Sequence, residues 1–406
     1  MAGVAGVVDG IVRSAFRRRI FILILLAPLG AGAIAFLCRR DLPDAEVVVR
    51  IAAVLIGSTI IGFVHLRHFW LAFLATIAPL PGVLLVATVT GGDAPMATVA
   101  YALGLVVALS AADEIAVRVA ENVPPPAAAH AAMQAIGAAA LAIVVVAILL
   151  ALAVGWLERD TAELLMGAAS ALTALLVVPL AASSLRFAED FVTSFNRVRE
   201  REERLMMPLL PVAHARWGAS VTGVLFVVCA LGYFGVATLA LAPSFHKTWL
   251  LAVFATMVAA VVAFLLVRDW RRTGAVVLSL VPVVLLTLWV MARLRTPLDA
   301  QSFQVLSVSF LTGFSLVLSV AVQAAHYMRG GNDMAVASAR AMERKAAMVV
   351  TATVACAFVA CLTTIALVVP LLFSAAAALL FQPAIAISIE ALFPRRETVA
   401  ARYRLR

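Results

Sequence analysis

The sequence has 406 residues, of which 64% are apolar and only 13% are charged. This balance lies far outside that of a soluble globular domain and indicates a protein that lives in lipid. The net charge of +9 could suggest nucleic acid, but most of the 31 Lys and Arg residues fall in alternate loops. Cytoplasmic loops of membrane proteins collect Lys and Arg in this way, so we expect no nucleic-acid partner.

Apolar runs of about 20 residues, enough to cross roughly 30 Å of hydrocarbon, recur along the chain. They predict twelve membrane-spanning helices. The predicted spans are 19–37, 46–65, 69–89, 96–117, 133–155, 161–184, 217–241, 248–267, 273–292, 300–326, 346–368 and 371–392. The loop charges place the N-terminus inside, and an even number of spans returns the C-terminus to that side. We expect a multi-pass protein of a bacterial cytoplasmic (inner) membrane with both termini cytoplasmic.

The chain contains an internal repeat. A gapless shift of the sequence on itself superposes "GLVVALSAADEIA" on "GFSLVLSVAVQAA", so that Gly104 meets Gly313 and Glu114 meets Gln323. Two six-helix halves follow, at 1–184 and 214–406, in parallel orientation because six spans return the chain to its starting side. The fold class predicted is therefore an all-α polytopic membrane protein built from two parallel six-helix repeats.

Residues 185–213 join the halves. Phe187, Phe191, Phe195 and Val198 recur there at helical spacing, and charged residues fill the rest of the surface. We expect an amphipathic linker helix on the cytoplasmic face of the membrane. A charged helix that only joins the halves explains the same pattern.

The chain resembles the transmembrane core of the resistance-nodulation-division (RND) superfamily, in particular its MMPL-like branch of lipid exporters, which includes hopanoid transporters. The resemblance is carried by the parallel repeat, the amphipathic linker and two loops that follow Gly-containing spans. These loops read "EIAVRVAENVPPPAAAHAAMQAIG" and "AHYMRGGNDMAVASARAMERKAA". It implies export of a lipid or other hydrophobic molecule that enters sideways between helices.

Two departures from the RND pattern matter. Family members carry large periplasmic porter domains where this chain has only "CRRDLPDAE" and "APSFHK". A periplasmic or membrane partner protein would have to supply them. The resemblance also implies an Asp in the middle of spans 4 and 10 as proton carrier, whereas Ser110 and Ser319 stand at those places.

The adjacent carboxylates Asp113 and Glu114 are the most unusual polar feature. Helical spacing puts them on one face with Ser110, and the equivalent face of span 10 carries Ser319, Gln323 and His326. Ionisable groups inside a membrane normally face a bundle interior or water. The six residues are our candidate proton relay or transport path, with one carboxyl able to hold a proton near neutral pH.

A structural reading of these residues stays open. Asp113 and Glu114 could reach the cytoplasmic headgroups, with Arg118 pairing Glu114 across one helical turn. His326 lies near the end of its span, where an interfacial histidine needs no transport role.

Pro79, Pro81 and Gly82 in span 3, with Pro282 in span 9, predict kinks in both halves and are hinge candidates. Shape alone would explain them equally well. The sequence holds no P-loop, no HExxH and no metal-ligand spacing, so we expect neither enzyme activity nor a cofactor or metal.

The function predicted is an inner-membrane RND/MMPL-like exporter of a lipid or hydrophobic molecule, driven by the proton gradient. Two alternatives remain: a non-transporting partner or scaffold subunit of a membrane complex, and a lipid- or sterol-sensing membrane domain.

Overall fold

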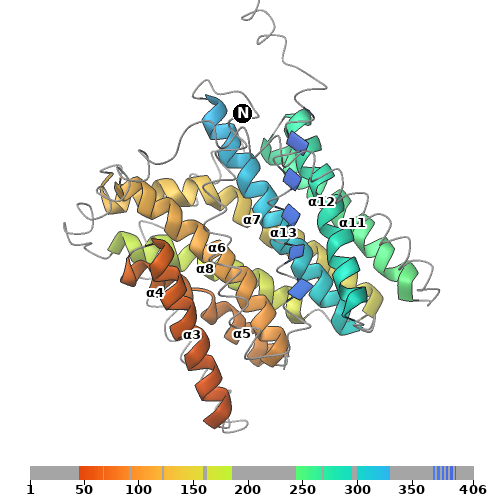
Figure 1. The fold of residues 1–406 in the computed structure, drawn as a ribbon, viewed down its shortest axis with the longest axis horizontal. Helices are drawn as coiled ribbons and strands as arrows, with labels where there is room; N and C mark the ends of the chain where they lie inside the picture. Colours follow the sequence, from red (N-terminus) through yellow and green to blue (C-terminus); the bar gives the residue numbers. More distant parts are fainter. Residues whose placement is uncertain are drawn as a thin grey trace, which may run out of the picture.

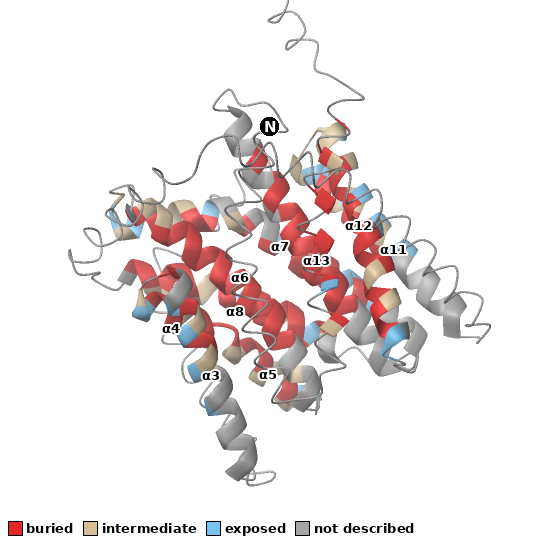
Figure 2. Ribbon diagram, in the orientation of Figure 1, coloured by how far each residue is buried: buried red, intermediate tan, exposed pale blue. Residues whose placement is uncertain are grey.

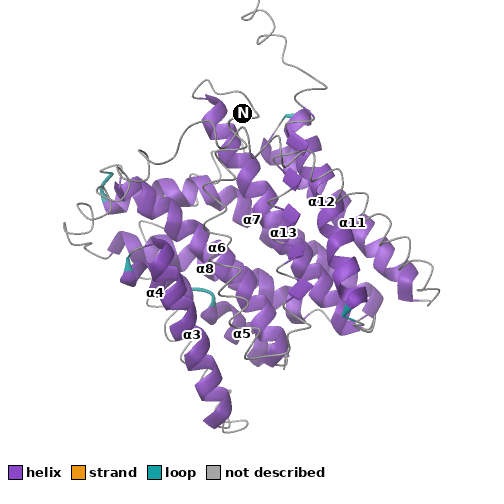
Figure 3. Ribbon diagram, in the orientation of Figure 1, coloured by secondary structure: helices purple, strands orange, loops and turns teal. Residues whose placement is uncertain are grey.

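In the computed structural model, every regular element of the described residues is an α-helix (Figure 3). The structure describes residues 45–66, 68–90, 94–120, 123–158, 162–184, 244–267, 269–294 and 300–329, with short pieces between 369 and 389. Helices are expected here because a chain in lipid must satisfy its backbone hydrogen bonds within each segment. The predicted spans at 19–37, 217–241 and 346–368 and the linker at 185–213 lie outside the described residues.

The described helices overlap the predicted spans. They are α3 (Ala45–Leu66), α4 (Phe69–Ile77), α5 (Leu80–Thr90), α6 (Ala94–Ala120), α7 (Pro125–Glu158), α8 (Ala162–Ser184), α11 (Ser244–Val267), α12 (Trp270–Arg293) and α13 (Ala300–Arg329). Most of their ends differ from the prediction by a few residues. α7 begins a full two turns earlier, because Pro125 suits the first helical position and the Ala-rich stretch after it favours a helix.

Four segments of the described chain are long and apolar enough to cross a membrane: Phe69–Thr90, Ala100–Val119, Leu164–Ser183 and Trp270–Met291. Three shorter apolar helices, Ala140–Leu152, Val253–Val267 and Ser307–Leu318, lie within three further predicted spans. The fold is thus that of an all-helical, multi-pass membrane protein.

α6 and α13 form the centre of the bundle (Figures 1 and 2). Every residue from 100 to 116 of α6 and from 307 to 318 of α13 is buried. The two helices contact each other, and α7 contacts both. α3 and α4 cover one side of α6, whereas α11 and α12 lie on the side of α13.

Large apolar side chains also cover the outer surface of the described helices, as expected for a surface that faces lipid tails. Exposed examples are Ile60 on α3, Leu152 on α7 and Met257 and Leu265 on α11. Along α12, Trp270 and Trp289 each stack with an Arg at opposite ends of the helix. Their spacing of about 29 Å at 1.5 Å per residue matches the hydrocarbon thickness, and Trp favours the two interfaces.

Candidate functional site

The acidic pair lies in the last third of α6. Ser110, Asp113 and Glu114 retain only 4%, 8% and 9% of their surface exposed. The expectation that these polar residues face the interior agrees with this burial. Carboxyl groups at this degree of burial require compensation by nearby polar or charged groups.

Arg118 supplies that compensation for Glu114. Its Nη2 lies 2.9 Å and its Nε 3.2 Å from Glu114 Oε1, one helical turn away. The side chains are 12% exposed for Glu114 and 27% for Arg118, so the ion pair lies at the edge of the buried region. This is the helix-surface pairing that the structural reading of the sequence predicted.

The α13 candidates are only partly described. Ser315, one turn before Ser319 in α13, is 4% exposed. Ser319, Gln323 and His326 lie in α13, but their side chains are outside the described residues. Contact between the two predicted polar faces therefore stays a prediction.

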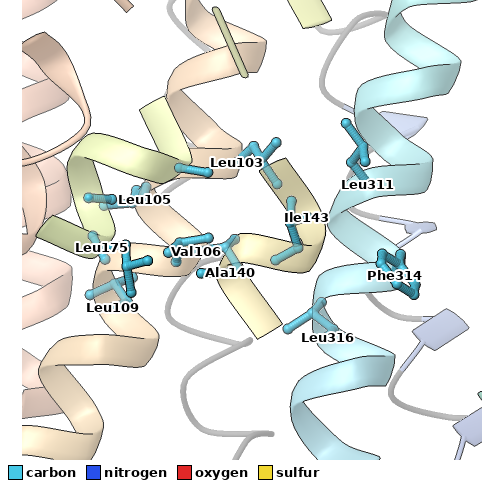
Figure 4. Close-up of a cluster of buried hydrophobic side chains, with 14 of the residues drawn as sticks. Leu103, Leu105, Val106, Leu109, Ala140, Ile143, Leu175, Leu311, Phe314 and Leu316 are labelled. Atoms are coloured by element: carbon cyan, nitrogen blue, oxygen red, sulfur yellow. The ribbon is translucent and has the colours of Figure 1, made fainter. Parts of the chain in front are cut away.

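Apolar side chains fill the space between α6, α7 and α13. Figure 4 shows Ile143 of α7 between Leu103 of α6 and Leu311 and Phe314 of α13. All four side chains are at most 1% exposed. At this level, upstream of the acidic pair, the centre of the bundle is closely packed by apolar groups.

The predicted kink at Pro79 is a break in the helix. α4 ends at Ile77, a turn covers Ala78 and Pro79, and α5 begins at Leu80. Pro79 and Pro81 cannot donate backbone hydrogen bonds, so they leave carbonyls of α4 without helical partners. α12, in contrast, continues through Pro282. Whether any of these positions acts as a hinge stays a prediction.

Neighbouring helices support this break. The Tyr101 hydroxyl of α6 donates a hydrogen bond to the Thr76 carbonyl at 2.9 Å. The Thr173 hydroxyl of α8 lies 3.5 Å from the Pro79 carbonyl. Neither side chain could be singled out from the sequence, because one Tyr or Thr in an apolar run does not indicate which carbonyl it will contact.

Two close helix crossings depend on a glycine and a serine. A methyl group at Gly104 would lie 2.6 Å from Ser170 Oγ, and this hydroxyl donates to the Ala100 carbonyl at 2.6 Å. At Gly313 a methyl group would lie 2.6 Å from Ser374 Oγ, and that hydroxyl donates to the Ser309 carbonyl. Gly104 and Gly313 are the pair that the repeat superposes. The serines were not singled out from the sequence.

The turn between α3 and α4 is built around His68. Its Nδ1 accepts a hydrogen bond from the Leu71 backbone N–H at 3.1 Å, and its carbonyl accepts one from the Ala72 N–H at 3.0 Å. His68 is thus the N-cap of α4. Burial lowers the pKa of its imidazole below the ordinary value, because it disfavours the charged form.

Among the described residues, no group of three or more His, Cys, Asp or Glu side chains could hold a metal ion. Ser110, the acidic pair and Arg118 lie along one stretch of α6.

The described helices define a multi-pass helical membrane protein with a buried acidic pair in a central helix. Two solved structures of SecDF share the fold. One, in its super-membrane-facing form, has a TM-score of 0.55 and 12% identity over 88% of this chain. The other, the translocon-associated membrane protein of Thermus thermophilus, has a TM-score of 0.57 and 13% identity over 85% of this chain.

The chain corresponds to 64% and 62% of the length of these two SecDF chains. No family model matches the sequence, and no curated protein matches it. At this level of identity the likeness concerns the fold alone.

Proposed function

We propose that this chain is an RND/MMPL-like exporter that uses the proton gradient of a bacterial inner membrane to move a lipid or other hydrophobic molecule. The observation that carries the proposal is the burial of Asp113 and Glu114 in α6, the central helix of an RND-like fold. Buried carboxyl groups in a membrane helix are costly and typically mark an ion or proton pathway.

Within the acidic pair we assign the proton to Asp113. Glu114 forms an ion pair with Arg118, with 2.9 Å between Oε1 and Nη2. Asp113 lies one residue earlier, deeper in the helix, and is equally buried. Ser110 lies one turn deeper and would extend the path toward the membrane centre. Ser319, Gln323 and His326 would form the opposite wall.

A hydrophobic substrate fits the surfaces that the helices present. Exposed apolar side chains on α3, α7 and α11 would let a lipid approach from the bilayer, which is how the resemblance implies that substrate enters. The short outer loops offer no space for a porter domain. Handover on the periplasmic side would therefore need a partner protein.

A second candidate is a non-transporting subunit of a membrane complex. It is favoured by Ser110 and Ser319 at the places where RND exporters usually carry Asp, and by the Glu114–Arg118 pair, which also serves a purely structural role. One SecDF neighbour is described as translocon-associated, so the partner could belong to such an assembly. A lipid- or sterol-sensing domain would use the same fold without a proton path.

Mass spectrometry separates these functions. The protein is extracted with its surrounding bilayer in polymer nanodiscs, and lipids and proteins are compared with the bulk membrane. Enrichment of one lipid without a stoichiometric partner is expected for an exporter or sensor. A stoichiometric protein without an enriched lipid would refute independent transport.

Mutation then separates exporter from sensor. Asp113→Asn is expected to abolish proton-driven release of the enriched lipid while leaving its binding intact. Asp269→Asn, a carboxyl substitution at the start of α12, is the matched control and should change neither. Unchanged release in Asp113→Asn would refute the proton assignment and favour the sensor.

A further inference from the structure

The helices α3, α4 and α6 meet at Gly62 of α3. A methyl group on Gly62 of α3 would lie 3.4 Å from Ala72 Cβ of α4 and 3.6 Å from Leu109 Cδ2 of α6. These three residues therefore share one depth in the bundle. Four residues after Ala72 on α4, the Thr76 carbonyl accepts a hydrogen bond from the Tyr101 hydroxyl, which lies eight residues before Leu109 on α6. The residue numbers therefore increase in opposite directions along the two helices, which are antiparallel.

This register brings His68 and Asp113 to the same depth. Residues four apart lie on one helix face, one turn apart. His68 lies one turn before Ala72, and Asp113 lies one turn after Leu109. Because α4 and α6 are antiparallel, these two steps lead in the same direction across the membrane. Leu66 of α3, one turn after Gly62, is 1% exposed.

We propose that His68 carries protons between Asp113 and the aqueous side of the membrane next to the α3–α4 turn. The inference rests on the proposed proton-coupled transport and names the group that connects its carboxyl to water. Asp113 is buried, whereas His68 is half-buried and lies in the turn outside the span. A proton leaving Asp113 needs such an intermediate group.

The cap hydrogen bond defines the chemistry of the step. Because Nδ1 of His68 accepts the Leu71 N–H, the neutral ring carries its hydrogen on Nε2 and its lone pair on Nδ1. In the transfer, the O–H bond of the Asp113 carboxyl breaks and an N–H bond forms at Nδ1, leaving a carboxylate and an imidazolium. The imidazolium then releases one proton to water. Protonation of Nδ1 breaks its hydrogen bond with the Leu71 N–H, which caps α4, and loss of that proton restores the bond.

The surroundings of the turn support release. Burial of the imidazole lowers its pKa, which favours the neutral form at the pH of the cytoplasm. From α6, the other charged groups at this level are Glu114 and Arg118, which neutralise each other. The last turn of α8 carries no titratable side chain, and neither does α4. On the α3 side the sequence places His65 and Arg67, whose side chains lie outside the described residues.

The corresponding turn in the second half provides a control. Asp269 caps α12, accepting the Arg271 N–H on Oδ1 at 3.1 Å and pairing with Arg272 through Oδ2 at 3.2 Å. It stands at the start of a helix as His68 does, but its carboxylate is held by an Arg. Replacing it perturbs a cap without touching the proposed path.

The test measures proton flux in liposomes of phosphatidylethanolamine and phosphatidylglycerol that contain the full chain and a trapped pH-sensitive dye. A pH gradient is imposed in both directions. Asp113→Asn should abolish flux. His68→Asn should reduce flux about tenfold or more, since Asn keeps a cap acceptor but cannot carry a proton. Asp269→Asn should behave as the wild type.

A second measurement does not depend on transport. Nuclear magnetic resonance of histidine labelled with nitrogen-15 follows the titration of His68 in the wild type and in Asp113→Asn. If the two groups are neighbours, removal of the carboxyl shifts the titration midpoint of His68. An unchanged midpoint overturns the pairing.

The outcomes distinguish the two proposals. Flux that requires Asp113 but is unchanged in His68→Asn overturns the role of His68 and leaves proton transport standing. Absence of flux in the wild type in both directions overturns the proton-coupled function, and with it the role of His68.

Discussion

Substitution of Gly82 by Ala tests how closely α5 and α8 pack. A methyl group at Gly82 would lie 2.3 Å from the carbonyl oxygen of Ala169, 2.4 Å from its carbon and 2.8 Å from the nitrogen of Ser170. All three are backbone atoms, so no rotation of a side chain can relieve the overlap. We expect α5 to move away from α8 and the protein to lose stability.

The expected loss is the difference between two effects. Overpacking of a tight contact costs typically 1–3 kcal/mol, and backbone overlap places Gly82 at about the upper end. Ala is favoured over Gly in a helix by about 1 kcal/mol. The net loss for Gly82→Ala is therefore about 2 kcal/mol. At Gly137 nothing lies within 4 Å of the added methyl group, so Gly137→Ala should gain about 1 kcal/mol.

Unfolding of the two variants in mixed detergent micelles, followed by circular dichroism, measures this difference. Gly274→Ala is a second control, because its nearest neighbour would be Ile389 Cδ1 at 3.9 Å. A Gly82→Ala variant as stable as Gly137→Ala would show that α5 and α8 do not cross closely enough at Gly82 to exclude a methyl group.

Three further substitutions have defined outcomes. Tyr101→Phe removes the donor to the Thr76 carbonyl at the helix break and should lower the unfolding free energy by about 1 kcal/mol; an unchanged value would mean that water replaces the hydroxyl. Ser374→Ala should lower the unfolding free energy by about as much, because it loses the hydrogen bond to the Ser309 carbonyl of α13. Ser302→Ala in α13 is the comparison, and an equal loss of stability in both variants would contradict this prediction. For His68, the folded state lowers the pKa, so the unfolded state binds more protons and stability rises with pH. The contribution of His68 to folding stability should be complete above its ordinary pKa of about 6.5 and decrease as the pH falls below that value. Melting temperatures between pH 5 and pH 8 test this, and a His68→Asn variant with the wild-type pH dependence would contradict it.

The positions of most of the described helices could be predicted from the sequence, because the length of an apolar run is fixed by the thickness of the membrane. α12 illustrates this: the run at 273–292 becomes Trp270–Arg293. The additional residues belong to the cap that Asp269 provides. The early start of α7 was missed because Ala favours a helix without making the run as apolar as a membrane span.

The candidate site could be predicted only in part. The interior position of Asp113 and the pairing of Glu114 with Arg118 follow from spacing along one helix. The depth of His68 relative to Asp113 depends on contacts among three helices, through Gly62, and no periodicity within a single helix contains that information. The same applies to the Pro79 break: the sequence predicts a kink there, but not that the Tyr101 hydroxyl of α6 donates to the Thr76 carbonyl beside it.

The burial of residues 100–116 of α6 also has a consequence for biosynthesis. α6 precedes α7, α8 and α13 in the chain, so it is inserted into the bilayer before the helices that will cover it have been translated. During that interval its acidic residues border lipid, where an isolated charge is costly. Because Glu114 and Arg118 are one turn apart in the same helix, their ion pair forms without any later segment. The newly inserted helix thus brings its own counter-ion for one of its two carboxyl groups.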